Sequence, residues 1–216
     1  MMAVAPTVFV VDDDASVRRS LTRLLASAGY TVEAFASARE FLARESYPGP
    51  CCLVLDVRMP GLNGLDLQET LAATGRRMSI VFVTGHIDVP MSVTAMKRGA
   101  ADLLTKPVDD TDLLAAVRRA LAKDVEDLGE ETRVADVRSR VNLLSPRETE
   151  VFALVVTGMP NKQIAAALGI SEKTIKVHRA RVMDKMQAGS VAELVRLADR
   201  VGVILPKARA KRPRPG

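Results

Sequence analysis

The stretch CCLVLDVRMPGLNG, residues 51–64, decides how this chain folds. It opens with a continuous apolar run that ends in Asp56, which is typical of a strand buried on both faces. A second such run is SIVFVT, residues 79–84, and shorter strand candidates are Thr7–Val11, Thr31–Phe35 and Asp102–Thr105. All-parallel sheets are almost always covered by helices on both sides, and their strands then show such continuous apolar runs. The sequence therefore predicts an α/β domain over its first half.

Segments with helical spacing separate and follow these strands. They span residues 15–28, 38–43 (with Ser37 as the cap), 64–74, 89–98 and 109–123. Because crossover connections between parallel strands are right-handed, this alternation leaves few topologies. We expect a five-stranded parallel sheet with helices on both faces.

Composition narrows the class of protein further. The 216 residues suffice for one large or two small domains, and 48% of them are hydrophobic. No apolar run approaches the roughly 18 residues of a membrane span, and the N-terminus lacks the basic start of a secretory signal. Cys51 and Cys52 are adjacent in an apolar run and are expected to be buried. Because neighbouring cysteines rarely form a disulfide with each other, the sequence is consistent with a reducing compartment. We expect a cytoplasmic protein without a membrane partner.

The net charge of +5 is unevenly distributed. Residues 143–216 hold 14 Lys or Arg and six Asp or Glu, a net charge of +8, whereas residues 125–142 carry −2. A basic block on a globular domain indicates a polyanion partner, although a solvated basic surface is the alternative. The acidic stretch before it is interpreted as a linker, partly helical, that could lie against the basic domain.

Polar side chains gather where the predicted strands end. Asp12 and Asp13 follow the first strand, while Asp56, Thr84 and Lys106 end or follow the others. The carboxyl ends of parallel strands form the ligand-binding edge of such a sheet. Two carboxylates about 4 Å apart repel by roughly 4 kcal/mol at an effective dielectric near 20, so a cation is needed there. Oxygen-only ligands suit Mg²⁺, and a carboxylate can also accept a phosphoryl group.

Each of these residues also has a structural interpretation. The acids of residues 12–14 could cap the following helix, and Asp56 could serve loop structure. Thr84 and Lys106 could be surface residues. The convergence of four strand ends on one edge favours a functional site.

The motifs VVDDD, LDVRMPGLNG, VTG and KP together resemble the receiver domain of two-component response regulators over residues 6–122. The resemblance implies a flavodoxin-like fold. It also implies that Asp56 is the phosphoacceptor and that Asp12, Asp13 and the backbone carbonyl of Arg58 hold Mg²⁺.

The same resemblance implies roles for two strand-end residues. Thr84 would be the switch hydroxyl and Lys106 would contact the phosphoryl group, with a cis peptide bond between Lys106 and Pro107. Receivers commonly carry Tyr or Phe three residues before this lysine, where the chain has Leu103. Without an aromatic ring to rotate, the signal would pass through movement of the strand around Leu103 and of the helix over residues 89–98.

The basic half predicts a small all-α domain. Helices are expected over residues 146–156, 161–168, 171–186 and 190–201, with Ser145, Asn161 and Ser171 as caps. The short turn with Gly169 between two of these helices is a helix-turn-helix signature.

The third of these helices has two predicted faces. Ile175, Val182 and Met186 form an apolar side, and small and basic residues suited to a DNA major groove form the other. The candidate DNA-binding residues are Lys162, Lys173, Thr174, Lys176, Val177, Ala180 and Arg181. Lys176 is the leading base reader, and Lys162, Lys173 and Arg181 are expected at phosphates. A solvated basic face is the alternative.

Residues 141–204, most closely the run from Asn161 to Ala180, resemble the LuxR-type helix-turn-helix. Together with the receiver motifs, TGH at residues 84–86 and DVPM at residues 88–91, they resemble the FixJ class of response regulators. The expected domains are a receiver (6–122), a linker (123–142), a DNA-binding domain (143–204) and a basic disordered tail (205–216).

This resemblance implies a non-enzymatic regulator that a sensor histidine kinase phosphorylates. It would then bind promoter DNA, as a homodimer, to control transcription. We favour activation over repression, with RNA polymerase as a candidate partner. Two alternatives stay open, a DNA-binding regulator that does not depend on phosphorylation and a Mg²⁺-dependent phosphohydrolase. The second would need a strong base, for which His86 is the one candidate.

Overall fold

The computed structural model of the chain describes residues 5–76, 78–85 and 88–202, in two compact units. The first unit is Met1–Gly129 and the second is Glu130–Gly216. His86 and the predicted basic tail lie outside the described residues. Among the helices that are described, none combines the length and the apolar character that a membrane crossing requires.

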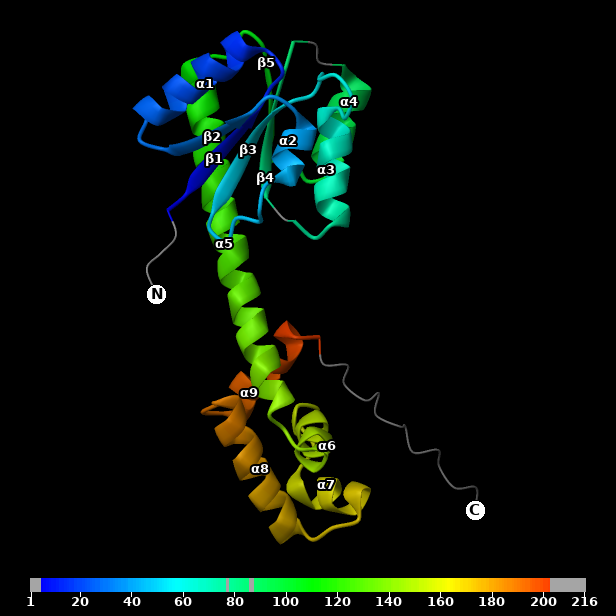
Figure 1. Ribbon diagram of the computed structural model, residues 1–216. Coiled ribbons are helices and arrows are strands. Elements are labelled where there is room, and N and C mark those ends of the chain that lie inside the picture. Colours follow the sequence, from blue (N-terminus) through cyan, green and yellow to red (C-terminus); the bar gives the residue numbers. More distant parts are fainter. Residues whose placement is uncertain (1–4, 77, 86–87, 203–216) are drawn as a thin grey trace. The chain divides into compact units, whose positions relative to one another are not determined.

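A five-stranded parallel sheet forms the centre of the first unit, in the order β2-β1-β3-β4-β5 (Figure 1). Its strands are β1 (Thr7–Val11), β2 (Thr31–Phe35), β3 (Cys51–Asp56), β4 (Ser79–Thr84) and β5 (Asp102–Thr105). Every residue of β1, β3 and β4 is buried, whereas the edge strand β2 is largely exposed. The predicted flavodoxin-like fold and the burial of the two apolar runs are thereby confirmed.

Successive strand residues point to opposite sides of the sheet. Because the central strands are apolar throughout, both faces of the sheet need a cover, and helices provide it. Phe9 and Leu53 pack in one core and Val8 and Val54 in the other. The first core is completed by α2 (Ala38–Ala43), α3 (Gly64–Ala73) and α4 (Val89–Lys97), and the second by α1 (Ala15–Ser27) and α5 (Asp110–Asn142).

The helix α5 runs for 33 residues, through the segment that we interpreted as a linker. The prediction that this helix ends at Lys123 was wrong. Glu, Arg, Leu and Ala, which favour helix, recur through the residues after Asp124, and a single Gly in a helix is tolerated. Asp124 is buried and its Oδ2 accepts a hydrogen bond from the Cys51 N–H at 2.8 Å, whereas Val137 is buried in the core of the second unit.

The second unit is helical. After the end of α5 it contains α6 (Pro146–Val155), α7 (Asn161–Leu168), α8 (Glu172–Met186) and α9 (Val191–Arg200). Gly169 ends α7 in the left-handed conformation with φ of 66°, which glycine adopts without steric cost and which turns the chain toward α8. The predicted helix-turn-helix is present in α7 and α8.

Two of the three predicted caps of this unit are confirmed. Ser145 and Glu148 form a reciprocal capping box at α6, and the Ser171 hydroxyl accepts from the Thr174 N–H at α8. The Asn161 prediction was wrong, because Pro160 occupies the N-cap position of α7 without a side-chain cap. The side chain of Asn161 is engaged elsewhere, since its Oδ1 accepts a hydrogen bond from Arg179 at 2.9 Å.

Candidate functional site

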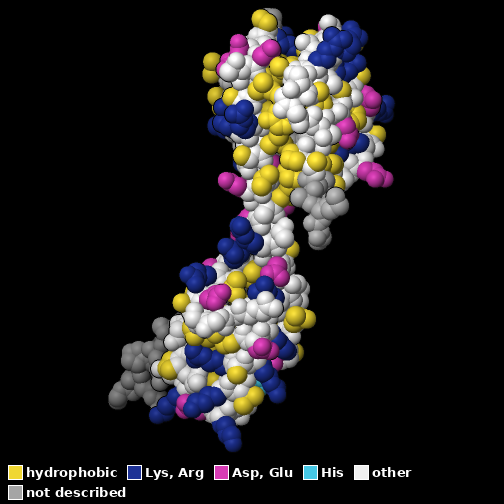
Figure 2. Space-filling model, turned by 90° about the vertical axis from the view of Figure 1, so that its left-hand side faces the viewer, with side chains coloured by type: hydrophobic (Ala, Val, Ile, Leu, Met, Phe, Trp, Pro, Cys, Tyr) yellow, Lys and Arg dark blue, Asp and Glu magenta, His cyan; other side chains and the backbone are white. Residues whose placement is uncertain are grey.

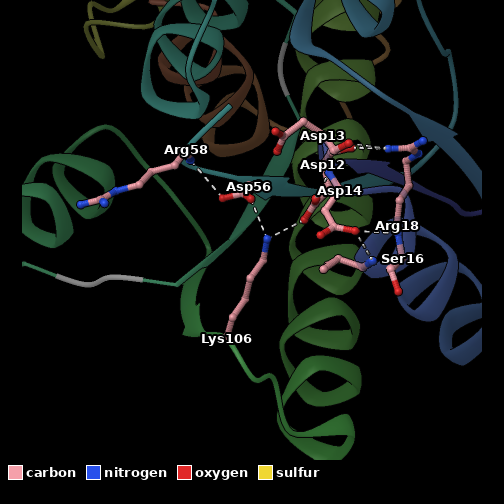
Figure 3. Close-up of polar contacts among 9 residues, drawn as sticks. Asp12, Asp13, Asp14, Ser16, Arg18, Asp56, Arg58 and Lys106 are labelled. Atoms are coloured by element: carbon pink, nitrogen blue, oxygen red, sulfur yellow. Dashed lines mark hydrogen bonds and ion pairs between the residues drawn. The ribbon is translucent and has the colours of Figure 1, made fainter. Parts of the chain in front are cut away.

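The ends of β1, β3 and β5 bring two carboxylates and one ammonium group into direct contact. Lys106 Nζ donates to Asp12 Oδ2 at 2.7 Å and to Asp56 Oδ2 at 2.6 Å (Figure 3). Asp12 is 1% exposed and Asp56 6% exposed. Three residues from distant parts of the sequence therefore form one buried charge cluster at the carboxyl edge of the sheet.

Burial and pairing act in opposite directions on this cluster. Burial raises the pKa of Asp12 above its ordinary value, and the hydrogen bond from Lys106 works against that rise. Burial alone would lower the pKa of Lys106, but its hydrogen bonds to Asp12 and Asp56 outweigh burial and raise that pKa. Lys106 therefore stays protonated at neutral pH and balances one of the two negative charges.

The acids also form a set of metal-binding donors. One carboxylate oxygen each from Asp12, Asp13 and Asp56 lies within 4.8 Å of the others, and Asp13 is exposed to solvent. A small oxygen-only set that leaves room for water fits Mg²⁺. The N–H of Arg58 donates to Asp56 Oδ1 at 3.0 Å, and its guanidinium extends away from Asp56 (Figure 3).

The helix-cap alternative holds for one acid of the DDD run. Asp14 caps α1 by accepting from the N–H groups of Ser16 and Val17, and these bonds lower its pKa. Asp12 and Asp13 belong instead, with Asp56, to the set of metal-binding donors, which we call the acid cluster. Of the three acids in the run, one therefore caps α1 and two belong to the acid cluster.

Gly64 sets the distance between α3 and the end of β3. A Cβ at this position would lie 2.4 Å from the backbone oxygen of Asp56 and 2.9 Å from the Cα of Val57. Both neighbours are backbone atoms that cannot swing aside, and the Gly64 N–H donates to Val57 O at 2.9 Å. A residue without a side chain is therefore required beside Asp56.

The remaining predicted receiver residues lie on β4 and β5. Thr84 is fully buried at the end of β4, and its backbone oxygen accepts from the Lys106 N–H at 2.8 Å. The Lys106–Pro107 peptide bond is cis, as expected. Leu103 is half-buried in β5 and packs against the core that includes Ala95 of α4.

Sequence reasoning missed Arg18. Its Nη1 donates to the backbone oxygen of Asp12 at 2.7 Å and to that of Asp13 at 3.3 Å (Figure 3). The available signal was an arginine near the start of α1, where the helix dipole favours acidic rather than basic residues.

The predicted DNA-facing residues lie on the surface of the second unit. Ile175, Val182 and Met186 are fully buried, so the apolar side of α8 is confirmed. The seven candidate DNA-binding residues, Lys162, Lys173, Thr174, Lys176, Val177, Ala180 and Arg181, are all exposed. Figure 2 shows Lys and Arg side chains gathered at the end of this unit that is lowest in the view.

Arg179 is a second residue that the sequence did not single out. Although it belongs to α8, it is half-buried, and its guanidinium donates to Asn161 at the start of α7. It therefore joins the two helices of the helix-turn-helix. Thr174, by contrast, shares a 2.8 Å hydrogen bond with Ser171 at the start of α8.

Two family models match the two units. The response regulator receiver domain matches residues 8–118. The model described as bacterial regulatory proteins, luxR family, matches residues 142–198.

Full-length relatives share both parts. Nodulation protein W of Bradyrhizobium diazoefficiens is 50% identical over 91% of this chain and 86% of its own length. Transcriptional regulatory protein FixJ of Azorhizobium caulinodans is 47% identical over 91% of this chain and 93% of its own. The solved structure of response regulator StyR is 45% identical, with a TM-score of 0.80 over 91% of this chain and all of that one.

Proposed function

The chain belongs to the FixJ class of two-component response regulators, and we propose that phosphorylation of Asp56 controls its binding to promoter DNA. The observation that carries the proposal is the cluster of Asp12, Asp56 and Lys106 at the carboxyl edge of the sheet. We place the receiver at residues 6–122 and the DNA-binding domain at residues 143–204.

In this proposal a carboxylate oxygen of Asp56 attacks the phosphorus atom of a phosphohistidine on a sensor kinase. The P–O bond forms as the P–N bond breaks, and the electron pair returns to the imidazole nitrogen. Asp12, Asp13, Asp56 and the backbone carbonyl of Arg58 would hold Mg²⁺, which supplies positive charge to the transferring phosphoryl group. Lys106 moves from pairing two carboxylates to contacting the new phosphoryl oxygens, and Thr84 donates its hydroxyl to them.

Labelling tests the phosphoacceptor and the metal requirement. Acetyl phosphate should give an acid-labile, hydroxylamine-sensitive label that Asp56→Asn abolishes. EDTA should block labelling, and excess Mg²⁺ should restore it. Labelling of the Asn variant would contradict the choice of Asp56, and labelling in EDTA would contradict the metal role.

The DNA-binding half of the proposal rests on the exposed basic face of α8. Lys176 would read bases, and Lys162, Lys173 and Arg181 would contact phosphates, with Thr174, Val177 and Ala180 completing the face. Addition of beryllofluoride and Mg²⁺, which mimic the phosphoryl group, should strengthen binding to a promoter fragment. If a dimer binds, its half-sites should be about one helical turn apart or a multiple of it.

Homodimer formation after phosphorylation is supported by α4. Val89, Val93 and Met96 follow one another at helical spacing and are 76%, 44% and 49% exposed. Exposed apolar patches often mark protein interfaces. Sedimentation with and without beryllofluoride should show a dimer that Val93→Asp weakens.

Leu103 takes the place of the aromatic switch in this proposal. Because it packs on the same core as α4, a shift of β5 would be transmitted to that helix. Leu103→Ala should change the DNA-binding response to phosphorylation while leaving the labelling itself intact. Loss of folding together with labelling would make Leu103 a core residue without a signalling role.

Two measurements separate this proposal from its alternatives. Turnover of small phosphate esters by the full chain would favour the phosphohydrolase. DNA binding by Asp56→Asn as strong as that of the wild type with beryllofluoride would favour a regulator independent of phosphorylation. Within the proposal, the protein acts in the cytoplasm without itself being an enzyme. It activates transcription, with RNA polymerase as the partner.

A further inference from the structure

The carbonyl groups of Asp12 and Asp13 are held by a positive charge. Arg18 Nη1 lies 2.7 Å from the oxygen of Asp12 and 3.3 Å from that of Asp13. Figure 3 shows Arg18 reaching these peptides from the side of α1, while Lys106 approaches the carboxylates from another direction. The guanidinium therefore binds the backbone of the acid pair and leaves its carboxylates to the cluster.

These contacts fix a short segment that carries much of the function. Asp12 is held at three further points: its N–H donates to Phe35 O, its Oδ1 accepts from the Asp14 N–H, and its Oδ2 accepts from Lys106. Asp13 is exposed, and the contact of Arg18 with its carbonyl ties its peptide to α1. A charged donor makes such a bond roughly twice as strong as a neutral one.

We propose that Arg18 is a positioning residue for the metal site, an inference that rests on the proposed function. By holding the two peptides, it keeps the carboxylates of Asp12 and Asp13 converged with that of Asp56 before the cation arrives. Less rearrangement is then needed on Mg²⁺ binding, so the affinity rises. Groups that orient metal ligands in this way typically contribute 10–100-fold in affinity.

The charge of Arg18 alone would change the Mg²⁺ affinity in the opposite direction. A guanidinium near a cation site repels the cation, so loss of Arg18 would tighten Mg²⁺ binding if its charge were all that mattered. Loss of positioning would weaken binding. The neighbouring Arg19 supplies a matched control, because it is exposed, also lies on α1, and differs from Arg18 in the contact with the acid pair.

The test is a Mg²⁺ titration of the unphosphorylated full chain, in which amide chemical shifts report binding. The amides of Asp14 and Arg58 are suitable probes, since they donate to Asp12 Oδ1 and Asp56 Oδ1. Arg18→Gln should raise the Mg²⁺ dissociation constant about tenfold. Arg18→Lys, which keeps a positively charged donor on a shorter side chain, should raise it less, and Arg19→Gln should change it less than about twofold.

Phosphorylation kinetics add a measurement that general damage to the fold would not reproduce. In Arg18→Gln, the Mg²⁺ concentration for half-maximal labelling should rise about tenfold, and the rate at saturating Mg²⁺ should match the wild type. The inference would be overturned if Arg18→Gln bound Mg²⁺ as tightly as the wild type does, or more tightly. If that variant does not fold, the same criterion applies to Arg18→Lys. Absence of Mg²⁺ binding in the wild type would instead defeat the proposed metal site itself.

Discussion

The acid cluster of the receiver and the basic face of α8 use charge in opposite ways. Asp12 and Asp56 are buried and bridged by Lys106 at hydrogen-bonding distance, whereas Lys173 and Lys176 are exposed to water. A buried charge depends strongly on each partner, and an exposed charge contributes little to folding. We therefore expect changes in the cluster to alter stability and chemistry together, and changes on α8 to act additively on DNA binding.

The largest effect is expected for Lys106→Met. This change leaves two buried carboxylates without the bridging ammonium, and it should lower the free energy of unfolding by about 3 kcal/mol in EDTA. Mg²⁺ should restore much of that loss, because it supplies positive charge at the same carboxylates. Urea unfolding in EDTA and in Mg²⁺ measures both values. Lys173→Met is the control on α8 and should stay within about 0.5 kcal/mol of the wild type. Equal losses in the two variants would remove the contrast.

A pair of Gly→Ala changes sharpens the comparison through the backbone. Gly64→Ala places a Cβ against the backbone of Asp56 and Val57, so it should destabilise the receiver by about 2 kcal/mol and slow labelling. Gly129→Ala, in the interior of α5 with no heavy atom within 4 Å of the added Cβ, should instead stabilise the helix by about 0.5–1 kcal/mol. Thermal unfolding of both variants checks the signs, and a shared sign would contradict the steric argument.

A buried carboxylate in the second unit should make the stability of that unit depend on pH in the acid range. The hydrogen bond from Lys185 and the N–H of Ser145 lower the pKa of Glu148 from 4.5 to about 2. A depressed pKa gives stability that is complete above the ordinary value and is lost as the pH falls from about 4.5 toward about 2. Glu148→Gln should remove about 1–2 kcal/mol at pH 7 and flatten this acid dependence. A variant that loses stability in acid as steeply as the wild type would exclude Glu148 as the source.

The smallest effects are expected on the exposed face of α8. Lys173→Ala should weaken binding to all DNA sequences alike and reduce the slope of log affinity against log salt by about 0.9. Lys176→Ala should instead relax preference at one base pair, by about 1 kcal/mol. Binding to matched and mutated sites over a range of salt distinguishes the two. The reverse outcome would mean that α8 is rotated on the DNA relative to our assignment.

The predictable parts of the fold rest on short-range patterns. The apolar runs before Asp56 and Thr84 gave the buried strands, and the shared edge of a parallel sheet brought Asp12, Asp56 and Lys106 together. These inferences succeeded because burial on both faces and strand direction are both readable from local sequence.

The missed features depend on tertiary contacts. The bond of Arg18 to two carbonyls requires the actual path of the segment after β1, and the contact of Asn161 with Arg179 requires the crossing of α7 and α8. The length of α5 was missed because a polar, mostly exposed run, residues 129–133, interrupts the helical spacing of its apolar residues. Val125 and Leu128 lie before this run, and Val134, Val137 and Val141 lie after it.

The contact between Asp124 and Cys51 has a practical consequence for isolating the receiver. A polypeptide that stops at residue 122, the boundary drawn from the sequence motifs, would lack the carboxylate that accepts from the buried Cys51 N–H at the start of β3. An amide donor inside the protein without its acceptor is costly, and here it lies at the entrance of the central strand. The shortest separately expressed receiver that keeps its interior intact therefore extends past Asp124.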